Sequence, residues 1–300
     1  MKFTFSTSDS TFHIDRTDKS LTINGGFAAF SSFLNRSKII DRLVDTCPIK
    51  RDSNNAFPIR DIIITFILTC VIEGKRFRHV RYIQNDEVVK KIFKLDRGVC
   101  SDDTIRRFFD DIDCDKGKKW LDQAFEILYS ALPEMFIIDW DSTVTTRYGE
   151  QDDVEVGYNP TKPGRGSHHP LLTTVAGLRM YLTVNVRPGN VHSANGILEV
   201  TNDLLDRLPE NKHPFAIRAD IGFCNNTILK WFEEKRNRPF YVFKLKKTSR
   251  VMEAIHSISD AVWDGVASFG AMQITEVSLK LTGWESARRV VLGRRLISKQ

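Results

Sequence analysis

The stretch MFIIDWDSTV, residues 135–144, decides the fold that we expect for the second half of this chain. Its apolar beginning predicts a buried strand, and a turn-forming Asp-Ser-Thr step follows it. Side chains alternate between the two faces of a strand, so Asp139 and Asp141 share one face and Trp140 lies on the other. Two carboxylates at the end of an apolar strand are unfavourable unless cations or hydrogen bonds satisfy them.

These two carboxylates allow two interpretations. A divalent cation such as Mg²⁺ or Mn²⁺ is a suitable partner, because both ions prefer oxygen ligands. Alternatively, Asp141 starts a turn and accepts a hydrogen bond from the backbone of Ser142 or Thr143. The motif by itself leaves both interpretations open.

A second carboxylate follows the strand predicted at residues 215–220, in the sequence IRADIGF. Asp220 ends this strand and precedes Gly222 and a helix that begins near Asn226. Functional groups in α/β proteins often lie at strand ends backed by a helix, although an ordinary loop or cap aspartate is the alternative. Asp141 and Asp220 are 79 residues apart with at least two strands between them. This spacing is consistent with neighbouring strands that share one ion.

Two polar segments lie between the aspartates. The first, GYNPTKPGRGSHHPLL at residues 157–172, contains Asn-Pro and Pro-Gly steps that predict an irregular, exposed loop. The second, RPGNVHSANG at residues 187–196, has the same character. Either could be a plain surface turn. Metal binding by the adjacent histidines is disfavoured, because neighbouring histidines rarely reach one ion. The possible phosphate donors are Lys162, Arg165, His168, His169, Arg187, Asn190, His192 and Ser193.

The wider hydrophobic pattern predicts two parts. Residues 1–24 read as a short hairpin or extended arm, and helices follow at 27–34, 39–44, after Pro58, and at 77–84, 87–95, 101–109 and 116–132, with Ser101 as an N-cap. Strands are expected at 171–176, 180–186 and 240–245, and helices at 197–208 and 226–235. We therefore predict a mainly helical domain at 1–130, an α/β core at 131–250, and the start of a β-rich insertion at 251–300.

Composition places the chain among ordinary globular proteins, with 41% hydrophobic and 27% charged residues. The formal net charge of +6 permits a polyanionic partner. Residues 235–250 contain seven basic and no acidic residues, including Lys244, Lys246 and Lys247, which favours a surface that follows phosphates. Arg76 and Arg78 belong to a second basic cluster, predicted to be a helix, which could contact DNA ends or could be an ordinary solvated face.

Cysteine usage and hydropathy limit the cellular setting. The five cysteines are scattered and form no Cys-x-x-Cys pair, so neither a disulfide framework nor a structural zinc site is expected. The N-terminus lacks the apolar segment of a signal peptide, and the most apolar run, residues 62–72, is too short to span a bilayer. These observations predict a cytoplasmic protein without membrane insertion.

Four blocks, taken in this order, carry a family resemblance: DWDST, GYNPTKPGRGSHHPL, VRPGNVHSANG and RADIGF. Together they resemble the signature blocks of bacterial insertion-sequence transposases of the DDE type, strongly over residues 100–250 and more loosely before. The resemblance implies an α/β fold with an RNase H-like mixed sheet and flanking helices, preceded by an all-helical domain that binds DNA ends. Asp141 matches the first catalytic aspartate because it begins the Asp-Ser-Thr step, and Asp139 is the alternative candidate for that role. Asp220 matches the second catalytic aspartate.

The resemblance also implies a cofactor and partners. Such enzymes hold two Mg²⁺ (or Mn²⁺) ions between acidic side chains, one to activate water or a 3′-hydroxyl and one to stabilise the leaving oxygen. The expected partner is double-stranded DNA, both the terminal inverted repeats and the target, bound by a homo-oligomer. The residues expected to contact DNA are Arg76, Arg78, Lys162, Arg165, Arg187, Asn190, Lys244, Lys246 and Lys247.

The sequence departs from this family at the third catalytic residue, a glutamate in a helix with a Tyr…Arg…Glu…Lys pattern. The only tyrosine after Asp220 is Tyr241, and no Arg-then-Glu follows it at the right spacing. We therefore expect a C-terminally truncated transposase with two of its three metal-binding acidic residues. One alternative is a non-catalytic DNA-binding fragment that inhibits a full-length transposase. Another is a nuclease that uses Asp139 as its third carboxylate. A glycosidase based on Asp141 and Asp220 is disfavoured, because the five tryptophans do not cluster.

Overall fold

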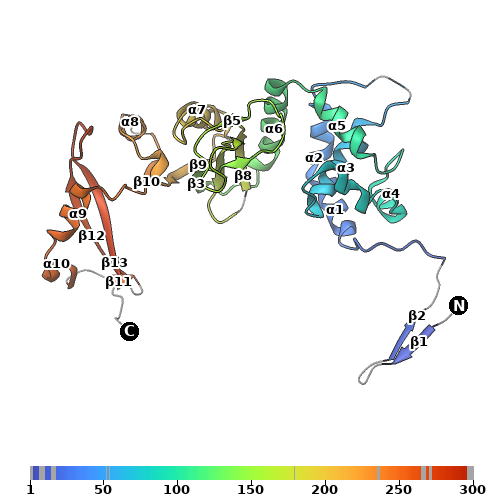
Figure 1. Ribbon diagram of the computed structural model, residues 1–300, viewed down its shortest axis with the longest axis horizontal. Helices are drawn as coiled ribbons and strands as arrows, with labels where there is room; N and C mark the ends of the chain where they lie inside the picture. Colours follow the sequence, from blue (N-terminus) through green and yellow to red (C-terminus); the bar gives the residue numbers. More distant parts are fainter. Residues whose placement is uncertain are drawn as a thin grey trace. The chain divides into compact units, whose positions relative to one another are not determined.

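The computed structural model describes residues 3–6, 11–14, 18–51, 53, 55–178, 180–234, 237–264, 268–269 and 272–295. The chain divides into two compact units, Met1–Ser130 and Ala131–Gln300, whose elements are labelled in Figure 1. Within the described residues, no helix has the length and apolar character needed to cross a membrane.

The first unit is helical apart from one hairpin at its start, where β1 and β2 pair antiparallel. A hairpin was one of the two predictions for this segment. The elements are β1 (Phe3–Ser6), β2 (Thr11–Ile14), α1 (Phe27–Ser37), α2 (Ile39–Asp45), α3 (Ile59–Val71), the 3₁₀ helix η1 (Phe77–Tyr82), α4 (Glu87–Phe93), α5 (Asp102–Asp110) and α6 (Cys114–Tyr129).

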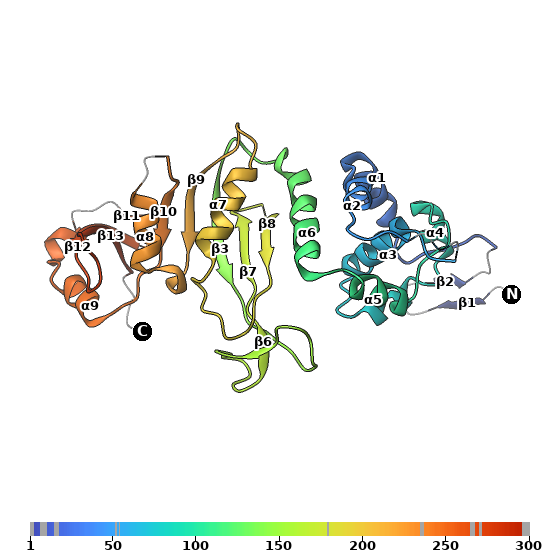
Figure 2. The same ribbon diagram turned by 90° about the horizontal axis from the view of Figure 1, so that it is seen from above.

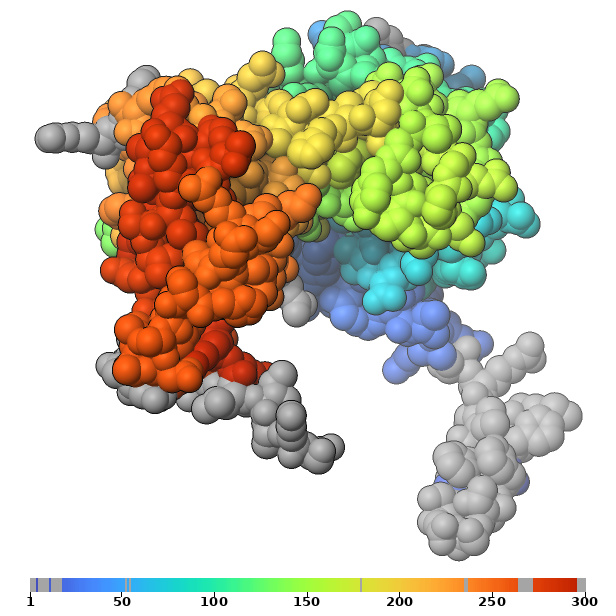
Figure 3. Space-filling model, turned by 60° about the vertical axis from the view of Figure 1, so that its left-hand side comes forward, coloured from blue at the N-terminus to red at the C-terminus, as the bar shows by residue number. Residues whose placement is uncertain are grey.

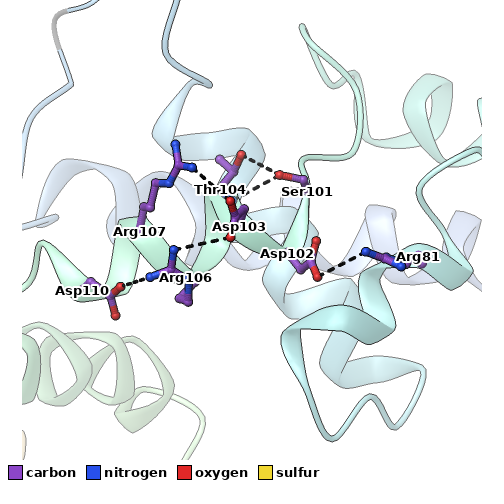
Figure 4. Close-up of polar contacts among 8 residues, drawn as sticks. All are labelled: Arg81, Ser101, Asp102, Asp103, Thr104, Arg106, Arg107 and Asp110. Atoms are coloured by element: carbon purple, nitrogen blue, oxygen red, sulfur yellow. Dashed lines mark hydrogen bonds and ion pairs between the residues drawn. The ribbon is translucent and has the colours of Figure 1, made fainter.

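The helices of this unit form where the apolar periodicity and capping residues predict them. Helix α3 follows Pro58, and its Ile62 and Leu68 are completely buried. Helix α5 begins after Ser101, whose hydroxyl accepts a hydrogen bond from the Thr104 amide at 3.2 Å (Figure 4). The predicted N-cap is therefore confirmed, and it satisfies a backbone donor that the helix itself leaves unpaired.

The basic segment at 77–84 differs from its prediction, because it is a six-residue 3₁₀ helix rather than an α-helix. The apolar side chains Phe77, Val80 and Ile83 recur every three residues, and Val80 and Ile83 are fully buried. A spacing of three residues matches one 3₁₀ turn, so this geometry puts all three on the core side. Arg76 lies before the helix in extended backbone. The predicted α-helix is therefore wrong for this basic cluster, while its contact with DNA stays a prediction.

The second unit carries the α/β core. Its elements are β3 (Met135–Ser142), β4 (Thr145–Thr146), β5 (Glu155–Val156), β6 (Gly166–His168), β7 (Leu171–Val175), β8 (Met180–Asn185), α7 (Ile197–Arg207), β9 (His213–Ala219), the 3₁₀ helix η2 (Ile221–Phe223), α8 (Asn226–Glu233), β10 (Phe240–Phe243), α9 (Ser249–His256), α10 (Asp260–Asp264), β11 (Ser268–Phe269), β12 (Met272–Leu279) and β13 (Arg288–Arg295).

The central sheet has five strands in the order β10-β9-β3-β7-β8. Strand β3 pairs antiparallel with β7 and parallel with β9, β7 pairs antiparallel with β8, and β9 pairs parallel with β10 (Figure 2). Helices α7 and α8 lie on the same side of this sheet (Figure 1). The predicted α/β class, with a mixed sheet and flanking helices, is confirmed.

One face of β3 forms the core of this unit. Phe136, Ile138 and Trp140 are buried, as the alternation in the sequence predicts. The Trp140 ring lies 5.9 Å from that of Phe223, 5.7 Å from that of Phe232 and 5.5 Å from that of Phe243. This aromatic cluster joins β3 to η2, α8 and β10, and leaves the two aspartates of the strand on the opposite face.

Two smaller sheets extend from the core. Strands β4, β6 and β5 form a three-stranded sheet within residues 145–168, which we call the lobe, and β11, β12 and β13 form the other. Figure 3 shows both at the surface, the lobe in yellow-green and β12–β13 in red. The predicted exposed, irregular loop is wrong for Asn159, Ser167, His168 and His169, which are all buried. The lobe folds against the turn at 188–190, where His168 bridges to Pro188.

Candidate active site

Asp141 and Asp220 lie at the ends of two neighbouring parallel strands. The last paired residues of β3 and β9 are Trp140 and Ala219, and each aspartate follows directly after its member of that pair. Adjacent strands are about 4.8 Å apart, and both backbones are extended here, so the two carboxylates are neighbours at one edge of the sheet. Both side chains are exposed. The predicted convergence of the two strand ends is confirmed, while the catalytic role stays a prediction.

Each aspartate uses one oxygen to order its own backbone. Asp141 Oδ1 accepts a hydrogen bond from the Ser142 amide at 2.8 Å, and Asp220 Oδ1 accepts one from the Gly222 amide at 2.9 Å. Within the part of the chain that the structure describes, the second oxygen of each carboxylate accepts no hydrogen bond. The two interpretations of Asp141 are therefore compatible, because the turn bond fixes the carboxylate and leaves one oxygen open.

Asp139 occupies a different environment on the same face of β3. Its two oxygens accept hydrogen bonds from Arg218 Nε at 2.6 Å and Nη2 at 2.7 Å. These hydrogen bonds raise the pKa of the Arg218 guanidinium. A bidentate partner already neutralises the Asp139 carboxylate. Asp141 is therefore better placed than Asp139 to offer an open carboxylate oxygen.

A hydrogen-bonded network connects the strand end to the second polar segment. His169 Nδ1 donates to the Val191 carbonyl at 2.7 Å, because that oxygen can only accept, and His169 Nε2 lies 3.2 Å from Ser142 Oγ. Ser142 Oγ is also hydrogen bonded to Ser193 Oγ at 2.9 Å. His169 is buried. The predicted role of His169 as a surface phosphate donor is therefore wrong, and it supports Ser142 instead.

His168 is buried as well, and both of its ring nitrogens are engaged. Arg147 Nε donates to His168 Nδ1 at 2.9 Å, and His168 Nε2 donates to the Asp152 carbonyl at 2.8 Å. This ring holds the β4–β5 connection against β6. The hypothesis that it contacts phosphate is therefore wrong for His168 too, because neither nitrogen faces solvent with an open donor.

Arg187 also points inward. The residue is 7% exposed, and its Nε donates to the His169 carbonyl at 3.0 Å. Its Nη1 lies 2.5 Å from the Asn195 carbonyl and 3.4 Å from the carbonyls of both His192 and Ser193. Burial lowers the pKa of this guanidinium. We therefore remove Arg187 from the expected DNA contacts, because the segment that follows it folds over its guanidinium.

The remaining predicted DNA contacts are solvent-exposed side chains. Lys162, Arg165 and Asn190 lie on the lobe and the adjoining turn, and Lys244, Lys246 and Lys247 follow β10. The Lys244 amide donates to the Ala219 carbonyl at 3.1 Å, which places the start of this basic segment beside Asp220. Arg76 and Arg78 are exposed in the helical unit. Six of these residues thus lie in the same unit as the two aspartates.

The donor set fits a hard divalent cation, because Asp141 and Asp220 each offer an open carboxylate oxygen. Among the described residues, however, no cluster of three or more His, Cys, Asp and Glu side chains could hold a metal ion. Within the described part of the chain, Asp141 and Asp220 are therefore the two candidate ligands, and water or phosphate oxygens would complete the coordination.

Residues 6–297 match the family described as Transposase DDE domain group 1. The chain belongs to this DDE transposase family. No curated protein sequence matches it. Among solved structures, this DDE transposase domain is similar to a piggyBac transposase synaptic complex with hairpin DNA, with 14% identity and a TM-score of 0.44, covering 85% of this chain and 58% of that one.

A second similar structure is the Drosophila P element transposase strand transfer complex, with 13% identity and a TM-score of 0.34. It covers 76% of this DDE transposase domain and 55% of the other chain. The domain therefore spans less than two thirds of either structure's chain. Neither likeness is close enough to assign residues, so the site rests on this chain's own geometry.

Two features of the site were absent from the sequence-based predictions. The pairing of Asp139 with Arg218 follows from the register of β3 and β9, which places them directly opposite each other. The contact between Ser142 and Ser193 joins residues 51 positions apart. The only sequence signal for either was that all four residues lie within the four motif blocks.

Proposed function

We propose that this chain cleaves and joins DNA as part of a transposase, with Asp141 and Asp220 as ligands of a divalent cation. The observation that carries this proposal is the position of the two open carboxylates, side by side at the ends of β3 and β9. The family supports the reaction class. We further propose that the core is RNase H-like, because three antiparallel strands followed by two parallel ones support that assignment.

The chain's own residues position and balance charge at this site. The amides of Ser142 and Gly222 each fix one oxygen of an aspartate, which leaves the other oxygen available to bind a cation. A bound Mg²⁺ or Mn²⁺ would supply an activated water or hydroxyl and would stabilise the charge on the leaving oxygen. Arg218 neutralises Asp139, so repulsion between the carboxylates at this edge is reduced.

DNA is the proposed partner, bound as terminal inverted repeats and target by a homo-oligomer. Lys244, Lys246 and Lys247 begin beside Asp220 and could follow the phosphates that enter the site. Lys162, Arg165 and Asn190 would contact the duplex from the lobe and the adjoining turn. Arg76 and Arg78 would contribute from the helical unit, where we propose recognition of the element ends.

A second candidate function is a non-catalytic DNA-binding protein that competes with a complete transposase. This function is favoured because the described residues do not place a third carboxylate beside Asp141 and Asp220 to complete a metal site. The two functions share their DNA contacts and differ only in cleavage. They can therefore be separated in one experiment.

The experiment measures nicking of a supercoiled plasmid that carries the terminal inverted repeats, with Mg²⁺ or Mn²⁺ present. Cleavage that Asp141→Asn and Asp220→Asn each reduce by about a hundredfold or more would support the catalytic proposal. Asp203→Asn is the matched control, because Asp203 is an exposed aspartate of α7 paired with Arg207. Repeat-specific binding without cleavage would support the competing protein. Two outcomes would contradict the proposed site. One is cleavage that both aspartate variants retain, and the other is the absence of both DNA binding and cleavage.

A further inference from the structure

We propose that Ser193 is a positioning residue that sets the separation of Asp141 and Asp220 by bridging the two strand ends. This inference rests on the proposed function, in which those aspartates share a cation. Ser193 lies in the polar segment after β8 and belongs to neither β3 nor β9. It nevertheless contacts the last residue of β3 and the turn that follows β9.

On the β3 side, the contact is a hydrogen bond. Ser193 Oγ lies 2.9 Å from the hydroxyl of Ser142, whose amide also holds Asp141 Oδ1. One residue of β3 thus connects Ser193 to the carboxylate of Asp141. A shift of the Ser193 hydroxyl would be transmitted to the amide that orients this carboxylate.

On the β9 side, the contact is close packing against a glycine. A Cβ atom at position 222 would lie 3.2 Å from both Cβ and Oγ of Ser193 and 3.1 Å from Asp220 Oδ1. Gly222 also donates its amide to that Asp220 oxygen. Ser193 therefore fills the space beside the turn that orients Asp220, and the glycine permits this approach.

Ser193 is itself partly buried, and the two side chains that support it, Arg187 and His169, are buried. Arg187 donates toward the carbonyls of His192, Ser193 and Asn195, so the backbone on both sides of the Ser193 hydroxyl is fixed. His169 adds a second connection, from the Val191 carbonyl to Ser142. These hydrogen bonds are partly buried, and partial removal from water strengthens them. Ser193 is thus held by groups that do not depend on a bound ligand.

Supporting residues of this kind tune metal affinity without touching the metal. Replacing an outer partner of a metal ligand typically weakens binding by about 10–100-fold. Ser193 acts through Ser142 and Gly222 rather than through a direct bond to either carboxylate. We therefore expect an effect near the lower end, about tenfold in the dissociation constant for Mn²⁺.

The test is a titration of the full chain with Mn²⁺ alone, followed by the electron paramagnetic resonance signal of the free ion. Ser193→Ala should weaken binding about tenfold, while its thermal unfolding temperature stays close to that of the unchanged protein. Ser257→Ala is the matched control, since Ser257 is an exposed serine directly after α9 whose hydroxyl donates to the Ala254 carbonyl of that helix. It should bind Mn²⁺ like the unchanged protein.

A double-mutant cycle with Ser142→Ala tests the bridge itself. If both serines act through their shared hydrogen bond, the double variant loses less affinity than the two single losses combined. Additive losses would overturn the bridge, as would unchanged affinity in Ser193→Ala. If Ser193→Ala does not fold, Ser142→Ala alone tests the same bond from β3, and unchanged binding there overturns the proposal.

The failure of the proposed function has a separate signature. It would appear as an unchanged protein that does not bind Mn²⁺, or as binding that Asp220→Asn leaves intact. Binding that Asp220→Asn abolishes and Ser193→Ala does not alter would retain the cation site and reject the positioning role.

Discussion

The strand-end site and the surface of α5 both concentrate arginine and polar side chains, but in opposite settings. On α5, Arg106 contacts Asp110 at 2.8 Å and Arg107 contacts Asp103 at 3.0 Å, and all four side chains are more than half exposed (Figure 4). At the site, Arg187 is buried among backbone carbonyls. Both regions are conspicuous in the sequence, so charge density alone does not identify a functional site. The two regions differ in the burial of their arginines, because Arg187 is buried and Arg106 and Arg107 are exposed.

The physical difference is one of solvation. Exposed pairs three or four residues apart on a helix contribute about 0.3–0.5 kcal/mol each, because water and salt screen them. A buried guanidinium that loses its partners, or buried carbonyls that lose their donor, have no water to replace the bond. We therefore expect substitutions in the two regions to differ strongly, and three predictions test this.

The largest effect is expected for Arg187→Ala. The change removes the donor shared by four carbonyls and leaves a cavity, so we expect the second unit to lose about 3 kcal/mol of unfolding free energy. Urea unfolding followed by tryptophan fluorescence measures this loss. Hydrogen exchange should also accelerate in residues 190–196.

Arg106→Ala is the matched control for that prediction. It removes the same side chain from α5 and should change the unfolding free energy by less than about 0.5 kcal/mol. Similar losses in the two variants would mean that the contrast between buried and exposed arginines does not hold in this protein.

An intermediate effect on stability is expected from the ion pair of Arg288 and Glu233, which is less buried than Arg187 and less exposed than the pairs on α5. This effect should depend on pH. Arg288 Nε and Nη2 donate to Glu233 at 2.7 and 2.8 Å, and these hydrogen bonds lower the pKa of Glu233 from its ordinary value of 4.5. A lowered folded-state pKa stabilises the protein above the ordinary value, and this stability is lost as the pH falls through the folded-state pKa.

The measurement is urea unfolding of the second unit at several pH values between about 5 and 3. The unchanged protein should lose more stability over this range than Glu233→Gln, which has no carboxylate to protonate. Glu253→Gln, an exposed position in α9, should keep the steeper dependence. An equal slope in all three proteins would contradict the assignment of the shift to Glu233.

The smallest effect of the three predictions, apart from the Arg106→Ala control, is expected for Ser101→Ala at the start of α5. The N-cap hydrogen bond to Thr104 would be lost, which costs about 1 kcal/mol in helices of this kind. Ser101→Asp should keep the cap, because aspartate also accepts from the same amide. Hydrogen exchange of residues 102–105 reports on the N-terminus of α5 alone. Unchanged exchange in Ser101→Ala would show that the cap does not stabilise this helix end.

Local signals in the sequence predicted much of this fold. The alternation in MFIIDWDS predicted the buried and open faces of β3, and Ser101 was recognisable as a helix cap. The α/β class and the neighbouring positions of Asp141 and Asp220 also followed, because strands with strong patterns have few alternative arrangements.

The remaining features depend on contacts between distant residues. The opposition of Asp139 and Arg218 requires the exact register of β3 and β9, which shifts at an irregularity between Phe136 and Ile137. The inward direction of Arg187 depends on carbonyls that the next eight residues bring over it. Polar loops that bury their own side chains have the same composition as exposed loops, so composition could not separate them.

The contact between Gly157 and the turn at Gly189 has a mechanical consequence. A Cβ at position 157 would lie 2.1 Å from the Gly189 carbonyl oxygen, and one at position 189 would lie 2.3 Å from Ser167 Oγ. The lobe and the turn therefore pack so closely that neither glycine position has room for one additional carbon atom. We therefore expect that a force applied to the lobe by a bound partner would not be absorbed by movement at this contact. It would instead be carried through the turn toward Arg187 and the ends of the strands.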